Sequence, residues 1–278
     1  MTDSDLLALF RSARRGVVKW VHYVPIYERL LSPYRERPMT LVEVGVGDGG
    51  SLEVWRRYLG PAARIIGIDC DPAAKQLEDE GLEIIIGDQA DPAFWVTHLA
   101  RIGPIDVLID DGGHTNFQQI VTVASALSHI RDGGVIVVED THTAYMPKTY
   151  AAAPGYGFID FARHIVDVMH RRSPFVTTPA GDRIGFASAI HRVEFFESIV
   201  VFHIDRRLCG PSQLIEAGTE SRPASSGPLT PHAAAVAALE SQPAWLQWLL
   251  HPARLAVGSA LRTVRRVRGA NRVRQYFR

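Results

Sequence analysis

The chain has 278 residues, a hydrophobic content of 46%, and equal numbers of basic and acidic side chains, 30 of each. This composition predicts a globular protein of one large domain, or one domain with an appendage, and the zero net charge argues against a nucleic-acid partner. Two distant cysteines, Cys70 and Cys209, an acidic N-terminus without a signal-like apolar run, and no apolar stretch near the ~20 residues of a spanning helix predict a cytoplasmic protein.

An aromatic and leucine-rich segment precedes the first predicted strand. Ser4 is placed to cap a short helix, a run of aromatic residues follows between Trp20 and Tyr27, and Pro33 and Pro38 end the segment. We expect this segment to fold over a cleft as a lid or to form a dimer contact. Simple packing of the aromatic side chains is the alternative.

A glycine-rich turn connects the first predicted strand, residues 40–46, to a helix. Gly45, Gly47 and Gly50 satisfy the G-x-G-x-x-G pattern, in which glycines let the backbone approach a ligand at a helix N-terminus. The pattern alone is weak. Glu43, an acid inside the strand, favours the cationic S-adenosylmethionine over the pyrophosphate of a dinucleotide. The candidate cofactor-binding residues of this region are Glu43, Gly45, Gly47 and Ser51.

Acidic and polar residues also end the next two predicted strands. Asp69 follows a strand beginning at residue 63, where an acid can accept hydrogen bonds from ribose hydroxyls. Asp71 better fits the cap of the following helix. Asp88 and Gln89 follow the strand at 82–86, and Asp88 could bind an adenine amine, although an ordinary turn acid is the alternative.

Two acidic clusters stand at the ends of two further β-branched runs, 105–109 and 134–138, with a crossover helix predicted over 116–130. The carboxyl ends of parallel strands share one sheet edge, so the clusters should meet in one cleft. Close carboxylates repel unless a cation lies among them, and oxygen ligands suit magnesium. The proposed ligands are Asp111, Glu139 and Asp140. Asp110 is a further candidate for cofactor binding, and His114 can accept a proton near neutral pH.

These motifs resemble the metal-dependent, S-adenosylmethionine-dependent sugar O-methyltransferases of macrolide biosynthesis, a group related to cephalosporin-hydroxylase-like proteins. The resemblance covers residues 16–205 and rests on Glu43-Val44-Gly45-Val46-Gly47, Ile68-Asp69, Asp110-Asp111-Gly112-Gly113-His114, and Glu139-Asp140 followed by Thr143-Ala144-Tyr145. It implies Mg²⁺ on Asp111, Glu139 and Asp140, with His114 as general base for a sugar hydroxyl. Family members commonly have serine where this chain has Gly113, which affects loop stiffness but not the proposed ligands.

The same resemblance implies a doubly wound, mostly parallel, seven-stranded α/β sheet of the Rossmann-like type, with a C-terminal antiparallel hairpin. We expect that hairpin at 186–195 and 199–204, after a loop over the cleft at 146–156 and a helix at 158–169. The predicted regions are a helical lid at 1–38, a methyltransferase domain at 39–209, a linker at 210–232 and a helical basic extension at 233–278.

The basic extension carries eight arginines and no acid between Arg254 and Arg278. Together with the apolar residues 245–250, it has the ingredients of an interfacial helix, so peripheral membrane contact stays open beside a packing helix or a subunit-pairing arm. We expect a homo-oligomer.

The predicted activity is methyl transfer from S-adenosylmethionine to a hydroxyl of a sugar, glycosylated metabolite or glycolipid. One alternative is a nicotinamide-dependent oxidoreductase or epimerase, which the missing Tyr-x-x-x-Lys pair disfavours. The other is a carbohydrate- or membrane-binding protein without catalysis.

Overall fold

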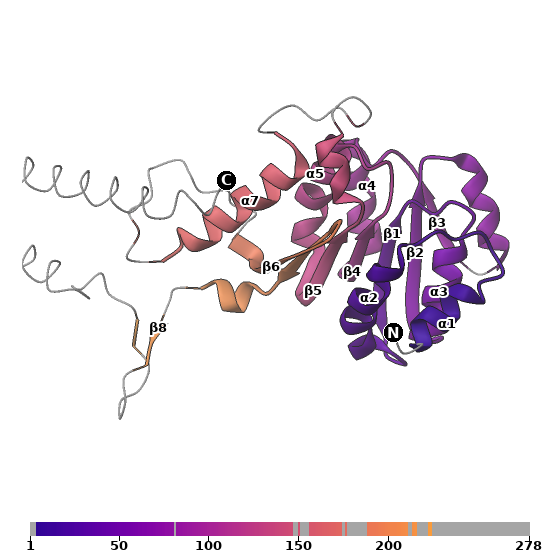
Figure 1. The fold of residues 1–278 in the computed structure, drawn as a ribbon, viewed down its shortest axis with the longest axis horizontal. Helices are drawn as coiled ribbons and strands as arrows, with labels where there is room; N and C mark the ends of the chain where they lie inside the picture. The colour runs from indigo at the N-terminus through magenta and orange to yellow at the C-terminus, as the bar shows by residue number, and fades with distance from the viewer. Residues whose placement is uncertain are drawn as a thin grey trace, which may run out of the picture. The chain divides into compact units, whose positions relative to one another are not determined.

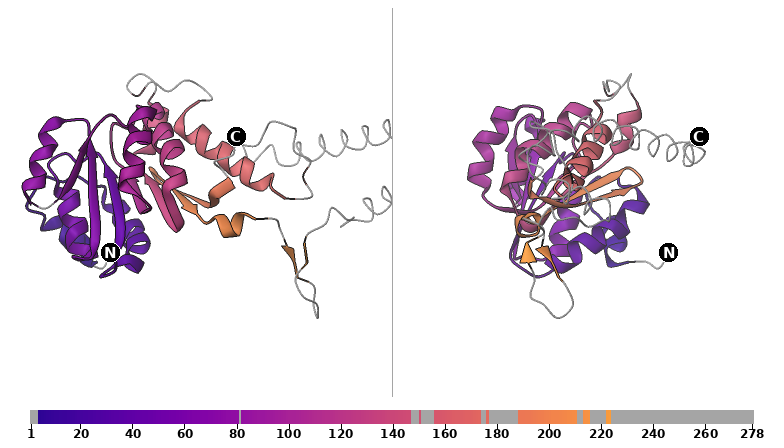
Figure 2. Two further views of the ribbon diagram at one scale, coloured as in Figure 1. Left: turned by 180° about the vertical axis from the view of Figure 1, so that it is seen from behind. Right: turned by 90° about the vertical axis from the view of Figure 1, so that its left-hand side faces the viewer.

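The computed structural model describes residues 4–80, 82–146, 150, 156–173, 176, 188–210, 213–215 and 222–223. The chain divides into two units, Met1–Gln213 and Leu214–Arg278. The first unit is a central sheet with helices on both faces (Figures 1 and 2). A small two-stranded sheet, β8 (Gln213–Leu214) with β9 (Arg222–Pro223), lies at the boundary between the units in the sequence.

The main sheet has seven strands in the order β3-β2-β1-β4-β5-β7-β6. Strands β1 to β5 are parallel to one another. Strand β7 pairs antiparallel with β5, and β6 pairs antiparallel with β7, which confirms the predicted fold class. Their bounds are β1 Met39–Val44, β2 Ala63–Asp69, β3 Glu83–Ile86, β4 Ile105–Asp110, β5 Ile130–Val138, β6 Ile190–Phe196 and β7 Ile199–Ile204. The chain order reverses between β1 and β4, and ligands bind outside the strand ends at such a point.

Two layers of helices cover the sheet. One face carries α4 (Pro92–Ile102), α5 (Asn116–Ala126) and α7 (Phe158–His170), and the other carries α1 (Asp5–Arg11), α2 (Val24–Leu31) and α3 (Gly50–Leu59) (Figure 1). Short 3-10 turns complete the unit: η1 Val21–Tyr23, η2 Ser32–Tyr34, η3 Pro72–Glu80, η4 Leu127–His129, η5 Thr141–Tyr145 and η7 Arg206–Cys209.

Strand alternation assigns each side chain to one of the two layers. In β1, Val42 and Val44 pack with α4 and α5, whereas Leu41 packs with α2 and α3. In β4, Leu108 faces the first layer and Ile109 the second. Side chains alternate between the two faces along a strand, and this alternation continues into the polar residues that follow each strand. It therefore decides toward which helix layer each of those polar side chains points.

Local capping sets the helix ends largely as the sequence predicts. The Ser4 hydroxyl accepts a hydrogen bond from the backbone N–H of Leu7, and Asp71 accepts one from Ala73. Thr115 and Gln118 form a capping box at the start of α5. The predicted first strand extends two residues too far, because Gly45 turns to a φ of 87° and leaves the ladder.

Three predicted features lie wholly or mostly outside the described residues: the loop at 146–156, the linker at 210–232 and the basic extension at 233–278. Within the described residues, no helix has the length and apolar character needed to cross a membrane.

Candidate active site

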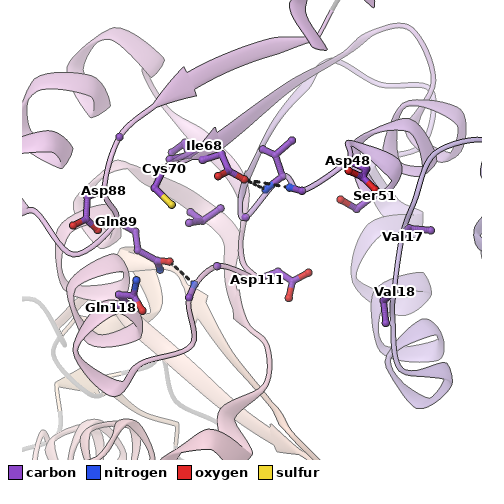
Figure 3. A pocket seen from close by; sticks show the side chains of 18 of the residues that line it. Val17, Val18, Asp48, Ser51, Ile68, Cys70, Asp88, Gln89, Asp111 and Gln118 are labelled. Atoms are coloured by element: carbon purple, nitrogen blue, oxygen red, sulfur yellow. Dashed lines mark hydrogen bonds between the residues drawn. The ribbon is translucent and has the colours of Figure 1, made fainter. Parts of the chain in front are cut away.

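A cavity of about 390 Å³ opens at the carboxyl ends of the central strands. The glycine turn after β1 forms its floor. Val17 and Val18 of the N-terminal segment lie on one side, and Asp88, Gln89 and Gln118 lie on the other (Figure 3). Of the predicted cofactor-binding residues, six line this cavity: Gly45, Gly47, Ser51, Asp69, Asp88 and Gln89.

The glycine turn is held tightly to the neighbouring strand ends. A Cβ on Gly45 would overlap the carbonyl oxygen of Asp111, so only glycine permits this approach. Asp69 closes the turn from the β2 side, because its Oδ2 accepts hydrogen bonds from Val46 N at 2.8 Å and Gly47 N at 3.2 Å (Figure 3). Both Asp69 oxygens contact backbone amides, since Oδ1 accepts from Asp71 N. Its predicted contact with ribose hydroxyls stays a prediction.

Gln89 links the cavity wall to a buried acid. Its amide donates to Asp110 Oδ1 at 3.0 Å and to Thr122 Oγ1 at 3.1 Å, and its carbonyl oxygen accepts from Gly113 N at 2.8 Å. Asp110 is fully buried on the α5 side, where burial raises the pKa of its carboxyl. It therefore supports the 112–113 turn from behind and is not among the described residues that line the cavity.

Glu43 is also fully buried, on the opposite face of the sheet. Its Oε2 accepts hydrogen bonds from Ser51 Oγ at 2.7 Å and Trp55 Nε1 at 3.1 Å, both from α3. Burial raises the pKa of Glu43 to about 7, and the ammonium of Lys19, whose Nζ lies 3.7 Å from Oε1, opposes that rise. The carboxylate thus lies behind the cavity lining, and its predicted contact with a cationic cofactor stays a prediction.

The two acidic clusters meet because the strand ladder continues past the strand ends. Asp111 N donates to Val44 O and Glu139 N to Asp110 O, each at 2.9 Å. Residues 111 and 139 follow Ile109 and Val137, which pack on the α2 and α3 side, so parity directs both carboxylates toward the N-terminal layer.

Lys19 lies at the centre of these carboxylates, and sequence reasoning missed it. Its Nζ is 2.5 Å from Asp111 Oδ2 and 2.5 Å from Glu139 Oε1, and its side chain is 3% exposed. Burial lowers the pKa of Lys19, but Glu139, Asp111 and Glu43 raise it by more, so the pKa rises and the ammonium stays charged. Tyr27 of α2 donates a further hydrogen bond to Glu139 Oε1. Burial raises the pKa of Glu139, while Lys19 opposes this.

A second group forms around His114. Its Nε2 lies 3.9 Å from Asp111 Oδ1 and 3.6 Å from Asp140 Oδ2, and one ligand atom from each of these three residues lies within 4.8 Å of the others. Two carboxylates and an imidazole fit a divalent cation that keeps several waters. Asp111 and Asp140 of the predicted metal set are thus brought together with His114, whereas Glu139 contacts Lys19 and Tyr27.

The backbone around this group is strained. His114 has a φ of 55° and Asp140 a φ of 52°, in the left-handed region that non-glycine residues seldom adopt. Thr143 Oγ1 donates to the His114 carbonyl at 2.8 Å, and Tyr23 OH donates to Asp140 Oδ1 at 2.7 Å. The first contact holds the backbone of His114, and the second holds the carboxylate of Asp140.

His142 is a second imidazole that the sequence analysis did not select. Its Nδ1 lies 4.0 Å from Asp140 Oδ1, on the other oxygen from the one that faces His114, and its side chain is 42% exposed. Its position two residues after Asp140, on η5, was a usable signal, because a residue that closely follows a strand-end acid lies at the same sheet edge.

Comparisons with known proteins connect this geometry to a group of enzymes. Residues 42–141 match a family described as a methyltransferase domain. The chain is 33% identical over 168 residues to the 8-demethyl-8-α-L-rhamnosyl tetracenomycin-C 2'-O-methyltransferase of Streptomyces olivaceus, covering 56% of this chain and 44% of that protein. It is 31% identical over 214 residues to the 8-demethyl-8-(2-methoxy-α-L-rhamnosyl)-tetracenomycin-C 3'-O-methyltransferase of the same organism, covering 73% and 51%.

A third relative, the mycinamicin VI 2''-O-methyltransferase of Micromonospora griseorubida, is 33% identical over 151 residues, covering 52% of this chain and 37% of that protein. The chain therefore spans about half the length, or less, of these relatives. Together they confirm the resemblance to sugar O-methyltransferases that the sequence motifs predict.

Solved structures of a methyltransferase also match this chain. MycE, a methyltransferase from the mycinamycin biosynthetic pathway in complex with Mg and SAH, matches with a TM-score of 0.63 and 26% identity, over 73% of this chain and 54% of that chain. A second crystal form matches with a TM-score of 0.66 at 22% identity, over 86% and 60%, and shows likeness of fold alone.

Proposed function

We propose that this chain, which carries a methyltransferase domain over residues 42–141, transfers a methyl group from S-adenosylmethionine to a hydroxyl of a sugar or glycosylated small molecule. The observation that carries the proposal is the adjacency of two sites. Asp111 lines the cavity beside the glycine turn and also contributes to the group with His114 and Asp140. A cofactor in the cavity and an acceptor at the acidic group would therefore meet at one residue.

The cavity supports binding of the nucleoside cofactor. Gly45 and Gly47 of the glycine turn line it, and Asp88 and Gln89 stand at the end of β3, where an adenine ring would be recognised. S-adenosylmethionine, when bound, supplies an electrophilic methyl group to a nucleophile held in line with it.

The acidic group supports binding of a divalent ion, proposed as Mg²⁺. Asp111 and Asp140 would hold it through carboxylate oxygens, and Glu139 is the third predicted ligand. The ion, when bound, would lower the pKa of a coordinated hydroxyl. Tyr23, through its hydrogen bond to Asp140, orients one of these carboxylates.

His114 is the proposed proton acceptor for the sugar hydroxyl. Its Nε2 lies 3.9 Å from Asp111 Oδ1 and 3.6 Å from Asp140 Oδ2, which places the imidazole beside the proposed metal ligands and so beside a hydroxyl bound there. His142 contacts the other oxygen of Asp140 and is the competing imidazole.

The proposed acceptor follows from the relatives, whose names describe rhamnosyl tetracenomycin and mycinamicin substrates. A homo-oligomeric state and a membrane contact through residues 233–278 are proposals from the sequence alone. So are the four regions with bounds at 38, 209 and 232.

The test compares His114→Ala with His142→Ala in methyl transfer to a rhamnosylated polyketide. We expect His114→Ala to lower kcat by roughly 10²–10⁴-fold, the usual contribution of a general base, while S-adenosylhomocysteine binding measured by calorimetry is retained. A large loss in His142→Ala with near-normal His114→Ala would transfer the role to His142.

A binding titration and a turnover assay test the rest of the proposal. Titration with S-adenosylhomocysteine and with NAD separates a methyltransferase from the nicotinamide alternative, since only the first should bind. EDTA should stop turnover and added Mg²⁺ should restore it. Full activity in EDTA would remove the metal from the proposal.

A further inference from the structure

The N-terminal segment from Ser12 to Lys19, here called the strap, lies across the glycine turn and α3. Arg14 donates to Glu53 from its backbone N at 3.2 Å and from Nε at 3.1 Å, and Arg15 Nη1 donates to Asp48 O at 3.2 Å. The strap then passes along the cavity, where Gly16, Val17 and Val18 form part of its wall. These contacts hold the exposed start of the strap against α3 and the glycine turn.

The far end of the strap is fixed by charge. Lys19 inserts its ammonium among three carboxylates, at 2.5 Å from Asp111 Oδ2, 2.5 Å from Glu139 Oε1 and 3.7 Å from Glu43 Oε1. The side chain is almost completely buried, so this is a preformed cation site occupied by the chain itself. No comparable ion pair with a buried lysine occurs elsewhere among the described residues.

Asp111 belongs to both the ammonium site and the group that fits a divalent ion. Its Oδ2 contacts Lys19, and its Oδ1 lies 3.9 Å from His114 Nε2. A divalent ion ligated by Asp111 would lie close to the ammonium, in a desolvated region where like charges repel strongly. A ligand set that included Glu139 would also have to replace the Lys19 contact to Glu139 Oε1.

We propose that Lys19 is an internal competitor of the divalent ion. The ammonium pairs with Asp111 and Glu139 until a divalent ion enters. The ion then displaces the ammonium, and the end of the strap that forms part of the cavity wall is released. This inference rests on the metal site of the proposed function. It adds that metal binding and strap position are coupled, and by linkage each must affect the other equally.

The first experiment measures metal affinity directly. Mn²⁺ is titrated into the full chain without cofactor or acceptor, and free Mn²⁺ is followed by electron paramagnetic resonance. Lys19→Met removes the charge at similar length and should tighten Mn²⁺ binding by about tenfold or more, a size typical of coupling between sites. Lys75→Met is the matched control, because Lys75 is a partly exposed lysine paired with Glu78 on η3, and its Mn²⁺ affinity should equal that of the unmodified chain.

The main comparison of the second experiment uses the unmodified chain, so it does not depend on the folding of Lys19→Met. Hydrogen exchange of the peptide covering residues 12–20 is compared with and without saturating Mn²⁺. Displacement of Lys19 should raise exchange there while the strands of the sheet are unchanged. In Lys19→Met, exchange of this peptide should be high already and insensitive to the metal.

The outcomes separate this inference from the proposed function. Equal or weaker Mn²⁺ binding by Lys19→Met, or unchanged strap exchange in the unmodified chain, overturns the competition while leaving the metal in place. Mn²⁺ binding by Lys19→Met alone would mean that the ammonium is never displaced in the unmodified chain, and it would overturn both the displacement and the metal of the proposed function. If neither chain binds Mn²⁺, both proposals fail.

Discussion

Gln89 holds the turn that leads to His114, although it carries no charge and stands on a different strand end. It spans from Asp110 and Thr122 to the backbone N–H of Gly113. A Cβ on Gly112 would overlap Gln89 Oε1, so the turn and the amide are fitted closely to one another. A buried polar link of this kind is strong when every partner is present and costly when one is lost.

Gln89→Leu should therefore destabilise the fold and loosen the site together. Because Asp110 and the Gly113 N–H would lose a buried partner, we expect the free energy of unfolding in urea to fall by about 2–4 kcal/mol. S-adenosylhomocysteine binding should weaken in calorimetry. The exposed Gln76→Leu serves as control and should change neither quantity by more than ~0.5 kcal/mol. Normal stability in Gln89→Leu would mean that the link is dispensable.

At this scale the sequence predicts which acids and which imidazole lie together better than it predicts their individual contacts. It identified Asp111, Asp140 and His114, because acids that end neighbouring strands share a sheet edge. Strand parity could also have separated Asp110, on the α5 side, from Glu43, on the α3 side. Lys19 could not be found, since its contacts depend on the path of an irregular segment more than 90 residues away in sequence from Asp111.

The turn after β1 passes close to the end of β4. Gly45 has a φ of 87°, and a side chain there would overlap the Asp111 backbone. The approach brings the cofactor cavity and the acidic group together at Asp111. The close approach depends on the backbones at two strand ends and not on any single functional side chain.

Gly45→Ala should separate these strand ends. Gly133 offers a matched control, because its φ is 90° but nothing lies within 4 Å of a Cβ there. Both alanines face the backbone cost of a positive φ, and Gly45→Ala should lose about 1–3 kcal/mol more in urea unfolding through overpacking. It should also lose S-adenosylhomocysteine binding. Equal losses at the two positions would contradict the close-approach argument.

The existence and order of the elements could be predicted because apolar runs, glycines and caps agree with one another along residues 40–140. Their ends were less certain, as at Gly45, where a ladder hydrogen bond and a turn compete. The antiparallel hairpin at the end of the sheet came from family resemblance, since pattern alone indicates only two strands, and the order of β7 before β6 was not predicted.

For the whole molecule, the antiparallel hairpin β7–β6 ties the last part of the sheet to the N-terminal layer. Arg29 of α2 pairs with Glu194 of β6, and Tyr23 OH donates to Ser198 O at 3.2 Å. His203 of β7 lies 3.5 Å from Glu194 and 3.1 Å from Arg192. Burial, then Arg192, lowers the pKa of His203 from 6.5 to about 4, with Glu194 opposing.

This shift predicts a pH dependence of global stability. The unfolded chain takes up the His203 proton near pH 6.5 and the folded chain only near pH 4, so the free energy of unfolding falls as pH drops through that interval and is fully restored above it. After discounting for solvent screening, the effect is about 1–2 kcal/mol. In urea unfolding, His203→Gln should lose less stability than the parent between pH 7 and pH 4.5. His191→Gln, at an exposed histidine of β6, should keep the parental profile. A parental profile in His203→Gln would refute the assignment.

The match to the methyltransferase family begins at residue 42, but several side chains that contact the acids of the site come from residues before it. Lys19, Tyr23 and Tyr27 each reach an acid beyond residue 110 from the first 27 residues of the chain. Trimming the protein to its recognisable portion would therefore expose Glu139 without its two donors, and leave an anionic hollow open to bulk solvent. Such a shortened chain could keep its sheet and still lack a working catalytic chamber, so domain boundaries for expression or for grafting onto other scaffolds should start ahead of the strap.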